Sequence, residues 1–418
     1  MTSTSGKEPV ALLLGNYRPS LTLARDLQRK GYRVVVSSHG CERGCQYSRA
    51  VSDIWDHAPL EATPDRFAQE LQMFHKDNPN LAVIFPVAEE YVRLIAEHEN
   101  SFEGLPPIAT VDAATVRKCL DKPYMMQLSH SCDVPTAPFS TSSNTEQFYS
   151  AMETVGFPLI VRPSDSTKRI DGAKALFLNS AAEAEQAFKD FSLGYQDLLL
   201  QQKFEGVRHN VYFAAHDGVV KRCLHAVIDR TDSPDGTGLA VEGRTLPAGH
   251  PLVDQTCSLV RALGYTGIGC AQFLFDEVTE QSSFLEINPR IAGNHALPEF
   301  AGLELGTFML DLALGRKPGA GSEQGRAGIR YCWTSGDLMG AKVSYLRGEV
   351  SLRETVTWII RALSVGFRSD VHMVFSVSDP APALHALWDV VPRLARWKRP
   401  VISPRQNTIT NHTSGKSL

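Results

Sequence analysis

The sequence predicts a protein of mixed α/β and α+β class, and three patterns along the chain support this prediction. Near the start, apolar runs at 10–14 and 34–36 flank a segment with helical spacing, which indicates a β-α-β unit. In the middle, apolar runs at 270–275 and 283–287 are separated by a mostly polar turn, as in a β-hairpin. Beyond residue 350, two segments have the spacing of amphipathic helices, 352–362 and 381–397.

The composition is that of an ordinary soluble globular protein. The 418 residues suffice for two or three domains, and 43% are hydrophobic and 21% charged. A net charge of −4 gives no electrostatic reason to expect nucleic acid or a membrane surface as a partner. The polar start contains no apolar signal region, and only two of the eight cysteines, Cys41 and Cys45, are close together. We therefore expect a cytoplasmic protein with reduced thiols.

The first predicted unit is doubly wound. The strand at 10–14 ends at Gly15, and the next turn lacks the G-x-G-x-x-G pattern, so no dinucleotide site is predicted there. Short strands are expected at 81–85 and 107–109. Glu89 lies just beyond the first of these, where open α/β sheets place ligands. It is predicted either to contact a substrate or to be a solvated carboxylate at a helix start.

The predicted hairpin in the middle of the chain carries hard oxygen ligands. Side chains alternate along a strand, so Glu286 and Asn288 point to one face while Leu285 points into a core. Gln272 can face them from the paired strand. One carboxylate and two amide oxygens suit Mg²⁺ that is also held by nucleotide phosphates. Arg290 follows the strand and is placed to meet an anion; the alternative is a buried hairpin with incidental polar residues.

The order Gln272, Glu286 and Asn288-Pro289-Arg290 resembles the metal-binding signature of the ATP-grasp superfamily, in the variant of the carbamoyl phosphate synthetase large subunit. The resemblance implies that the protein binds ATP and Mg²⁺ or Mn²⁺, with Gln272, Glu286 and Asn288 as the metal ligands. It also implies a catalytic role for Arg290.

Two earlier segments look like phosphate-binding parts of the same superfamily. Asp121-Lys122-Pro123 resembles the entry to its catalytic domain, where Lys122 would reach the nucleotide phosphates. The predicted strand at 156–164 is similar to one whose cation, here Arg162, binds phosphate and takes part in catalysis. The following polar segment takes the place of a glycine-rich flap, and Lys168 there would substitute for backbone contacts to phosphate.

The segment 198–206 resembles the hinge that holds adenine. The resemblance implies nucleotide contacts from Gln201, Lys203 and Phe204. The position of a ribose-binding glutamate falls near His209, so the ribose contact is not identified, and His209 is interpreted as an ordinary strand-edge histidine. Residues 237–247 are expected to form a polar loop, in which Arg244 either meets a carboxylate or is solvated. Residues 297–314 are expected to form one apolar helix.

The resemblance covers about residues 10–318 and predicts four regions. These are a Rossmann-like pre-ATP-grasp domain, an ATP-grasp domain with its lid at about 150–200, a C-terminal α+β region and a disordered tail, with bounds 1–115, 116–318, 319–404 and 405–418. The basic end of the predicted last helix is compatible with a partner or membrane surface, but a packed helix is preferred.

We expect an ADP-forming ligase that joins a carboxylate to an amine through an acyl phosphate. The resemblance implies two small-molecule substrates of amino-acid-like character, and no pattern identifies either one. A homodimer is left open. One alternative is an enzyme that activates bicarbonate, like carbamoyl phosphate synthetase or biotin carboxylase, although the chain holds one grasp unit and no glutaminase or biotin-carrier segment. The other alternative is an ATP-binding module without catalysis.

Overall fold

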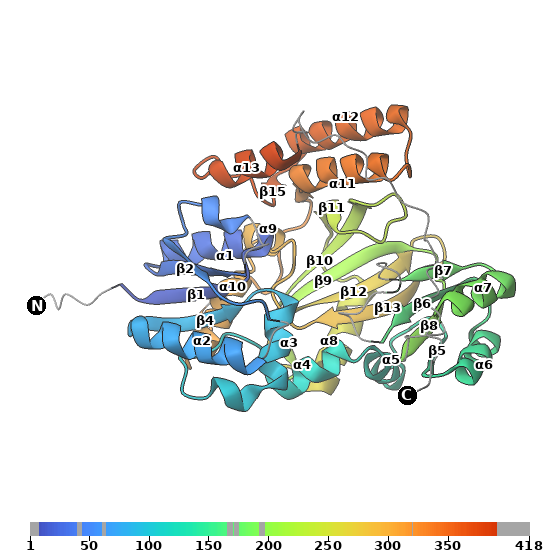
Figure 1. Ribbon diagram of the computed structural model, residues 1–418, viewed down its shortest axis with the longest axis horizontal. Coiled ribbons are helices and arrows are strands. Elements are labelled where there is room, and N and C mark those ends of the chain that lie inside the picture. The colour runs from blue at the N-terminus through green and yellow to red at the C-terminus, as the bar shows by residue number, and fades with distance from the viewer. Residues whose placement is uncertain are drawn as a thin grey trace, which may run out of the picture.

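The computed structural model describes residues 8–39, 44–60, 64–164, 170, 175–191, 197–319 and 321–390. The described strands form three sheets, and Figure 1 shows the N-terminal sheet at one end, a large central sheet and a small sheet at the other end. The C-terminal helices lie along one side of this row. The predicted α/β and α+β class is confirmed.

The first sheet is parallel and has helices on both faces. Its strand order is β3-β2-β1-β4, with β1 (Val10–Leu14), β2 (Arg33–Ser38), β3 (Asp53–Asp56) and β4 (Leu81–Pro86). One face packs against α1 (Arg18–Arg29), and the other packs against α2 (Pro64–Asp77) and α3 (Glu89–Glu97). Two short 3₁₀ helices belong to this part, η1 (Cys45–Tyr47) and η2 (Glu99–Phe102). The strand predicted at 107–109 is only a single bridge, from Ile108 to Ile84.

The central sheet has seven strands and is antiparallel except for its last pair. Its order is β13-β12-β9-β10-β11-β14-β15, with β9 (Val207–His216), β10 (Val219–Thr231), β11 (Ala240–Thr245), β12 (Gly267–Asp276), β13 (Gln281–Asn288), β14 (Arg330–Cys332) and β15 (Val371–His372). One face is covered by α4 (Ala113–Leu120), α5 (Lys122–Ser131) and α8 (Pro251–Leu263). The apolar part of the other face packs against α9 (Ala296–Phe300), α10 (Leu305–Ala313) and the first sheet.

The third sheet is small and antiparallel, and it lies within the predicted lid region. Its order is β5-β8-β6-β7, with β5 (Phe139–Ser142), β6 (Leu159–Pro163), β7 (Leu176–Leu178) and β8 (Leu198–Gln202). Its apolar face packs against α6 (Thr145–Val155) and α7 (Ala181–Phe191). Because side chains alternate along a strand, Arg162 and Gln201 lie on the opposite face, away from these helices.

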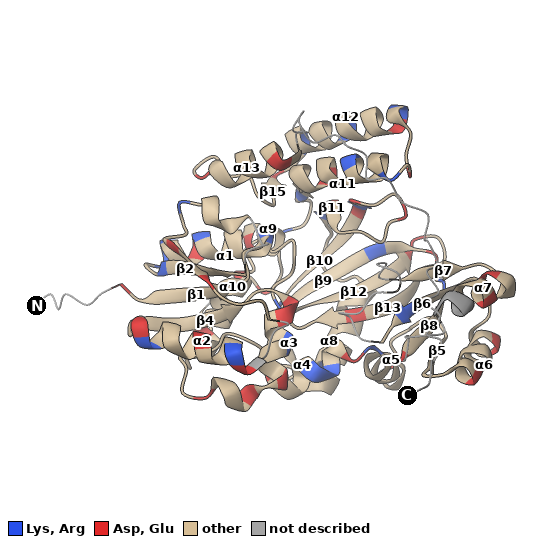
Figure 2. Cartoon of the chain, in the orientation of Figure 1, with Lys and Arg blue, Asp and Glu red and all other residues tan. Residues whose placement is uncertain are grey.

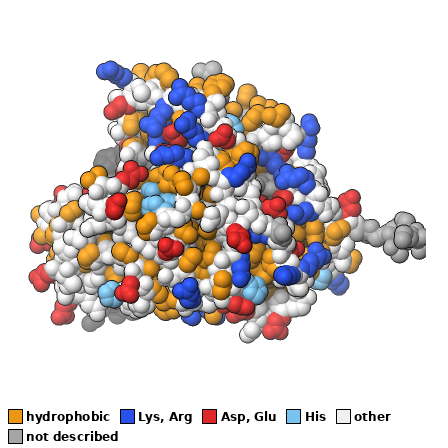
Figure 3. All heavy atoms as spheres, turned by 180° about the vertical axis from the view of Figure 1, so that it is seen from behind, with side chains coloured by type: hydrophobic (Ala, Val, Ile, Leu, Met, Phe, Trp, Pro, Cys, Tyr) orange, Lys and Arg blue, Asp and Glu red, His pale blue; other side chains and the backbone are white. Residues whose placement is uncertain are grey.

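The C-terminal part consists of α11 (Thr334–Leu346), α12 (Leu352–Arg368) and α13 (Ala381–Val390) around the short strands β14 and β15. Several apolar side chains of α12 and α13 are exposed, among them Ile360, Phe367 and Trp388. Figure 3 shows hydrophobic and basic side chains interspersed on this end of the molecule, seen from behind. Within the described part of the chain, no helix has both the length and the apolar character needed to cross a membrane.

Two predictions about elements are wrong. The expected single helix at 297–314 is two helices, because the chain turns between α9 and α10 with φ of +95° at Gly302 and +47° at Glu304. The expected polar loop at 237–247 contains β11, which pairs with both β10 and β14. The predicted tail at 405–418 lies outside the described residues, and the predicted domain bounds stay predictions.

Candidate functional site

Polar side chains form a row across three neighbouring strands of the central sheet. Asn210 of β9 lies opposite Gln272 of β12, which lies opposite Glu286 of β13, so these three side chains share one face. Asn288 follows two positions after Glu286 on the same strand and bonds to it. The register therefore brings Gln272, Glu286 and Asn288 together, as the sequence predicted.

A β-bulge interrupts this row. Gln272 lies opposite Glu286 but Phe273 lies opposite Phe284, which leaves Leu285 as the additional residue of β13. Leu285 was predicted to point into a core, and this is wrong because it is only partly buried at the bulge. The bulge turns the end of β13, and with it Glu286 and Asn288, relative to β12.

Glu286 is the partly buried anion of the site. Its Oε1 accepts a hydrogen bond of 2.9 Å from Asn288 Nδ2. Burial by itself raises the pKa of Glu286, but this bond and the charges of Arg162, Lys122 and Arg290 outweigh burial and hold that pKa below its ordinary value. Glu286 is therefore ionised at neutral pH, with three cations around it.

The Asn288 amide links Glu286 to Arg290. Its Oδ1 accepts a hydrogen bond of 3.1 Å from Arg290 Nη2, while its nitrogen faces the carboxylate. A metal ion would require the oxygen on the carboxylate side instead. A half-turn of the amide supplies that oxygen and breaks the bond from Arg290.

Arg290 joins the central sheet to the first sheet. Its guanidinium forms an ion pair with the carboxylate of Glu89, with Nη2 and Oε2 separated by 3.0 Å. Glu89 is the first residue of α3, and Figure 2 shows acidic and basic positions meeting where α3 begins. The predicted substrate contact Glu89 therefore holds Arg290 at the mouth of the site.

The two predicted phosphate-binding cations approach Glu286 from other elements. Lys122 is the first residue of α5, and its Nζ donates to the carbonyl oxygen of Pro163 at 3.2 Å. Asp121 caps this helix, because its carboxylate accepts from the backbone N–H of Tyr124 at 2.9 Å. Arg162 is partly buried, and its Nε is buried and has no hydrogen-bond partner among the residues that the structure describes. Lys168 lies outside the described residues.

Several polar groups of the predicted adenine hinge already form hydrogen bonds or ion pairs within the protein. Gln201 is buried, and its Oε1 accepts from Arg162 Nη2 at 2.8 Å. The backbone N–H of Lys203 donates to Pro158 at 2.9 Å, and its ammonium pairs with Glu205 at 2.6 Å. Nucleotide contacts from this hinge would therefore use the carbonyl of Lys203 and the backbone of Phe204. The Gln201 oxygen retains a second lone pair.

Three residues that the sequence did not single out carry buried polar atoms without a partner in the described part of the chain: Asn210 Oδ1, Arg208 Nε and Arg18 Nη1. Asn210 lies beside Gln272, and Arg208 shares its face of β9. If the pairing of β9 with β12 had been known, the alternation of side chains along β9 would have placed both residues on the face of Gln272. Nothing in the sequence indicated Arg18.

Arg18 extends from α1 towards the central sheet. Its Nε donates to the carbonyl oxygen of Gly293 at 2.7 Å, and its guanidinium lies 3.7 Å from the centroid of the Trp333 ring. Burial lowers the pKa of Arg18 to about 10, so it stays charged at neutral pH. Arg18 is thus a charged, partly buried residue that joins α1 to the segment after β13.

Two other predicted contacts lie outside this constellation. Arg244 lies in β11 and pairs with Asp229, and it shares the sheet face of Val227 and His209 rather than that of Gln272. The predicted carboxylate contact of Arg244 is therefore not at this site. His209 was interpreted as a strand-edge residue, but it is buried on the same opposite face.

The chain is similar to known proteins in this region. Residues 121–319 match the family model described as the carbamoyl-phosphate synthase L chain, ATP binding domain. Biotin carboxylase 2, chloroplastic, of Populus trichocarpa is 23% identical over 250 residues, which are 54% of this chain and 44% of that protein. The chain thus spans less than half the length of that curated relative.

Solved structures extend the likeness over most of the chain. A biotin carboxylase from Campylobacter jejuni, solved as a complex with an ATP analogue, superposes with a TM-score of 0.61 at 14% identity, covering 78% of this chain and 74% of that one. An L-amino acid ligase from Bacillus licheniformis superposes with a TM-score of 0.56 at 15% identity, covering 74% and 75%. At such identities the superpositions establish a common fold.

Proposed function

We propose that this chain, which belongs to the ATP-grasp superfamily, is an ADP-forming ligase that joins a carboxylate to an amine through an acyl phosphate. The substrates would be small molecules, and the bond formed would be an amide. Lys122 and Arg162 would bind the phosphates, Glu286 would hold a metal ion, and Arg290 would act on the acyl group.

The observation that supports the proposal most is the excess of positive charge around Glu286. Lys122, Arg162 and Arg290 all act on this carboxylate, and Arg290 also pairs with Glu89, so three cations face two carboxylates. A buried donor without an acceptor costs about 1–3 kcal/mol, and more when it is charged, so Arg162 Nε calls for an acceptor. A nucleotide polyphosphate supplies both the missing negative charge and the missing acceptors.

The residues present also fit a divalent ion of the Mg²⁺ type. Glu286 is ionised, and Gln272 and Asn288 lie beside it. Asn210, opposite Gln272 on β9, has an amide oxygen without a partner in the described part of the chain. Hard oxygen ligands of this kind suit Mg²⁺ or Mn²⁺. When bound, such an ion would neutralise charge on the phosphates as the γ-phosphoryl group is transferred.

The reaction proposed for this chain has two steps. An oxygen of the substrate carboxylate attacks the γ-phosphorus, and the bond from that phosphorus to the β-phosphate oxygen breaks, which releases ADP. The amine then attacks the acyl carbon, and inorganic phosphate leaves as the amine loses a proton. Lys122 and Arg162 would hold the phosphates in line throughout.

Arg290 would stabilise the negative charge that develops on the acyl oxygen in the second step. In the structure its guanidinium is held by Glu89 and Asn288. Glu89 would act as a positioning residue, because its ion pair fixes the guanidinium before substrate arrives. Arg18 and Arg208 add positive charge beyond the predicted phosphate site, which favours substrates that carry a carboxylate.

A second candidate is an enzyme that activates bicarbonate. The match to the carbamoyl-phosphate synthase ATP binding domain and the likeness to biotin carboxylases favour it. The two candidates share the phosphoryl transfer and differ in the acceptor. ADP formation that depends on added bicarbonate, in buffer freed of carbon dioxide, would select this second candidate.

The direct test of the proposed site measures Mg²⁺-dependent ADP formation in two variants of one hairpin. Glu286→Gln removes the partly buried carboxylate, whereas Glu280→Gln makes the same change at an exposed turn position. We expect Glu286→Gln to abolish turnover while the protein remains folded, and Glu280→Gln to behave as wild type. Near-native turnover in Glu286→Gln would remove Glu286 from the metal site.

A further inference from the structure

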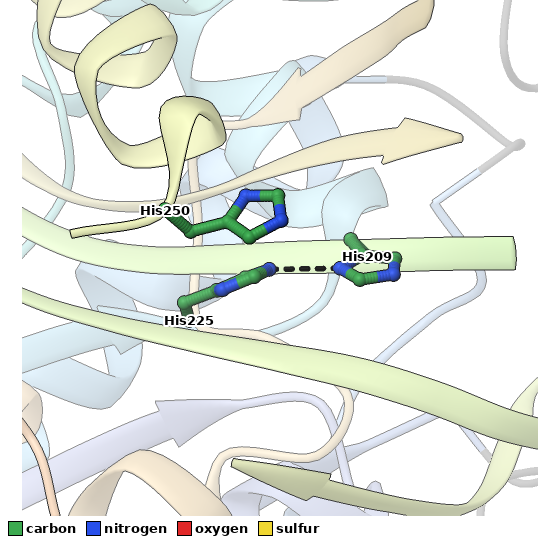
Figure 4. A group of neighbouring side chains, drawn as sticks. All are labelled: His209, His225 and His250. Atoms are coloured by element: carbon green, nitrogen blue, oxygen red, sulfur yellow. Dashed lines mark hydrogen bonds between the residues drawn. The ribbon is translucent and has the colours of Figure 1, made fainter. Parts of the chain in front are cut away.

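Three histidines from separate elements meet on the face of the central sheet opposite the candidate site (Figure 4). His209 lies in β9, His225 lies in β10, and His250 directly precedes α8. One ring nitrogen of each lies within 4.8 Å of those of the other two. His209 pairs with Phe273, whereas its neighbour Asn210 pairs with Gln272, so the sheet itself separates the two sites.

The cluster is built into the core. His209 and His225 are buried, and a hydrogen bond of 2.8 Å joins His209 Nδ1 to His225 Nε2. The His250 ring lies over both, with its centroid 4.3 Å from that of His225 and 5.7 Å from that of His209. Phe275 contacts His209 and His250 and makes part of the surroundings apolar.

The buried rings have unmet polar capacity. His209 Nε2 and His225 Nδ1 are buried and have no hydrogen-bond partner among the residues that the structure describes. Whichever tautomers are present, one shared proton satisfies only one nitrogen of each ring. The neighbouring positions on this face are apolar, for example Val211 and Phe213, so packing alone does not call for imidazoles here.

The rings are also in the protonation state that metals require. Burial lowers the pKa of His209 to about 4 and that of His225 to about 3, with the neighbouring histidines adding to both effects. Burial likewise lowers the pKa of His250, and Glu277 opposes that shift. Neutral imidazoles offer lone pairs to a cation, whereas protonated ones repel it.

We propose that His209, His225 and His250 bind one divalent transition-metal ion of the Zn²⁺ class, with water as a fourth ligand. In a tetrahedral site with metal–nitrogen distances of about 2.0–2.1 Å, ligand nitrogens are about 3.3 Å apart. The His209–His225 pair at 2.8 Å would open slightly, and the ion would take the place of their shared proton. That proton would move to the open nitrogen of the same ring, so that His209 Nε2 and His225 Nδ1 both carry protons and both rings stay neutral. His250 is only partly buried, which leaves a path for the ion and the water.

The local charges permit such an ion. The nearest cation, Arg244, is neutralised by its ion pair with Asp229, and Glu277 lies near His250. One feature opposes it, because His250 Nδ1 caps α8 by accepting from Leu252 N–H at 3.3 Å. Ligation through Nδ1 would give up this long hydrogen bond, whereas ligation through Nε2 would keep it. In either case the ion would lie near a helix N-terminus, which disfavours cations.

The test uses the full chain without an affinity tag, stripped of metal with a chelator and titrated with Zn²⁺ and with Co²⁺ as a spectroscopic probe. We expect one ion per chain, visible-region absorption typical of tetrahedral Co²⁺, and a higher melting temperature with Zn²⁺. His225→Gln and His250→Asn should each weaken binding by more than about 100-fold, since loss of an outer-shell partner alone costs up to that factor.

Three controls make the result decisive. His250→Asn keeps a side chain that caps helices, so it should fold as wild type without metal and still lose the ion. His216→Gln changes an exposed histidine of β9, the strand that also carries His209, and should bind Zn²⁺ normally. Glu286→Gln should keep the Zn²⁺ site, which makes this inference independent of the proposed ligase activity. The inference would be overturned if Zn²⁺ did not bind in a 1:1 ratio, or if neither His225→Gln nor His250→Asn weakened its binding.

Discussion

The hydrogen-bond donors of Arg162 indicate what kind of ligand the site binds. The residue is partly buried, its Nη2 donates to Gln201 at 2.8 Å, and its buried Nε has no partner among the described residues. Burial lowers its pKa, and Glu286 opposes this shift. An arginine with a buried, open donor implies an anion that enters the site, and the following prediction tests that implication.

Arg162→Ala should raise KM for ATP and lower kcat, so that kcat/KM falls by at least about tenfold. A loss of this size corresponds to one charge-assisted pair, which contributes ~1.5–3 kcal/mol. Arg162→Lys should recover part of the loss, because it keeps the charge but not the two-pronged donor geometry. Arg33→Ala, which removes an exposed arginine paired with Asp53, serves as the control. Unchanged steady-state constants in Arg162→Ala would place this residue outside the nucleotide site.

Glu286 provides a second test at the same scale, through the pH dependence of stability. Its pKa in the folded protein lies below the ordinary value of 4.5, so the folded state favours the ionised form. That stabilisation is fully present above the ordinary pKa and is lost as the pH falls through the folded pKa. The unfolding free energy should therefore fall more steeply below about pH 5 in wild type than in Glu286→Gln. Denaturant titrations that give parallel pH profiles for the two proteins would contradict this account.

The residues of the site divide into those that the sequence could predict and those that it could not. Glu286, Asn288 and Arg290 lie within five positions on one strand and its exit, so local alternation suffices to group them. Asn210 joins them only through the register of β9 against β12. Arg18 joins them from α1 across a tertiary contact with Gly293, which no local pattern encodes.

At the scale of elements, helix starts place several of the functional side chains. Lys122 and Glu89 are the first residues of α5 and α3. The Asp121-Lys122-Pro123 pattern predicted the start of α5, because a capping carboxylate and an early proline are both local signals. The break between α9 and α10 was missed, since the apolar spacing continues across Gly302 and Glu304 while the backbone does not.

The cap of α5 yields a prediction that links an element to the site. Asp121→Ala should lower the unfolding free energy by ~0.5–2 kcal/mol, because Tyr124 N–H loses its acceptor. It should also raise KM for ATP, because the cap holds the first turn that carries Lys122. Asp121→Asn preserves an acceptor and should restore both quantities. If Asp121→Ala were less stable but retained its KM for ATP, the position of Lys122 in the nucleotide site would not depend on the cap.

At the scale of the molecule, the site lies where three sheets meet. The small sheet contributes Arg162, the central sheet contributes Glu286, and Glu89 comes from the helix after a strand of the first sheet. The order of motifs along the chain predicted the doubly wound start and the antiparallel centre. The packing of Arg18 on Trp333 could not be predicted, because it depends on how distant parts of the chain dock.

The central claim is that the substrate carboxylate itself accepts the phosphoryl group, and trapping the acyl phosphate tests it most directly. The protein is incubated with Mg²⁺, ATP and a panel of amino acids and small carboxylic acids, with hydroxylamine in place of the natural amine, and products are measured by mass spectrometry. The account predicts a hydroxamate from the correct acid, together with ADP and phosphate in equal amounts. It predicts that Glu286→Gln forms none of these products. AMP and pyrophosphate as products, or ADP formation that requires bicarbonate and yields no hydroxamate from any organic acid, would contradict it.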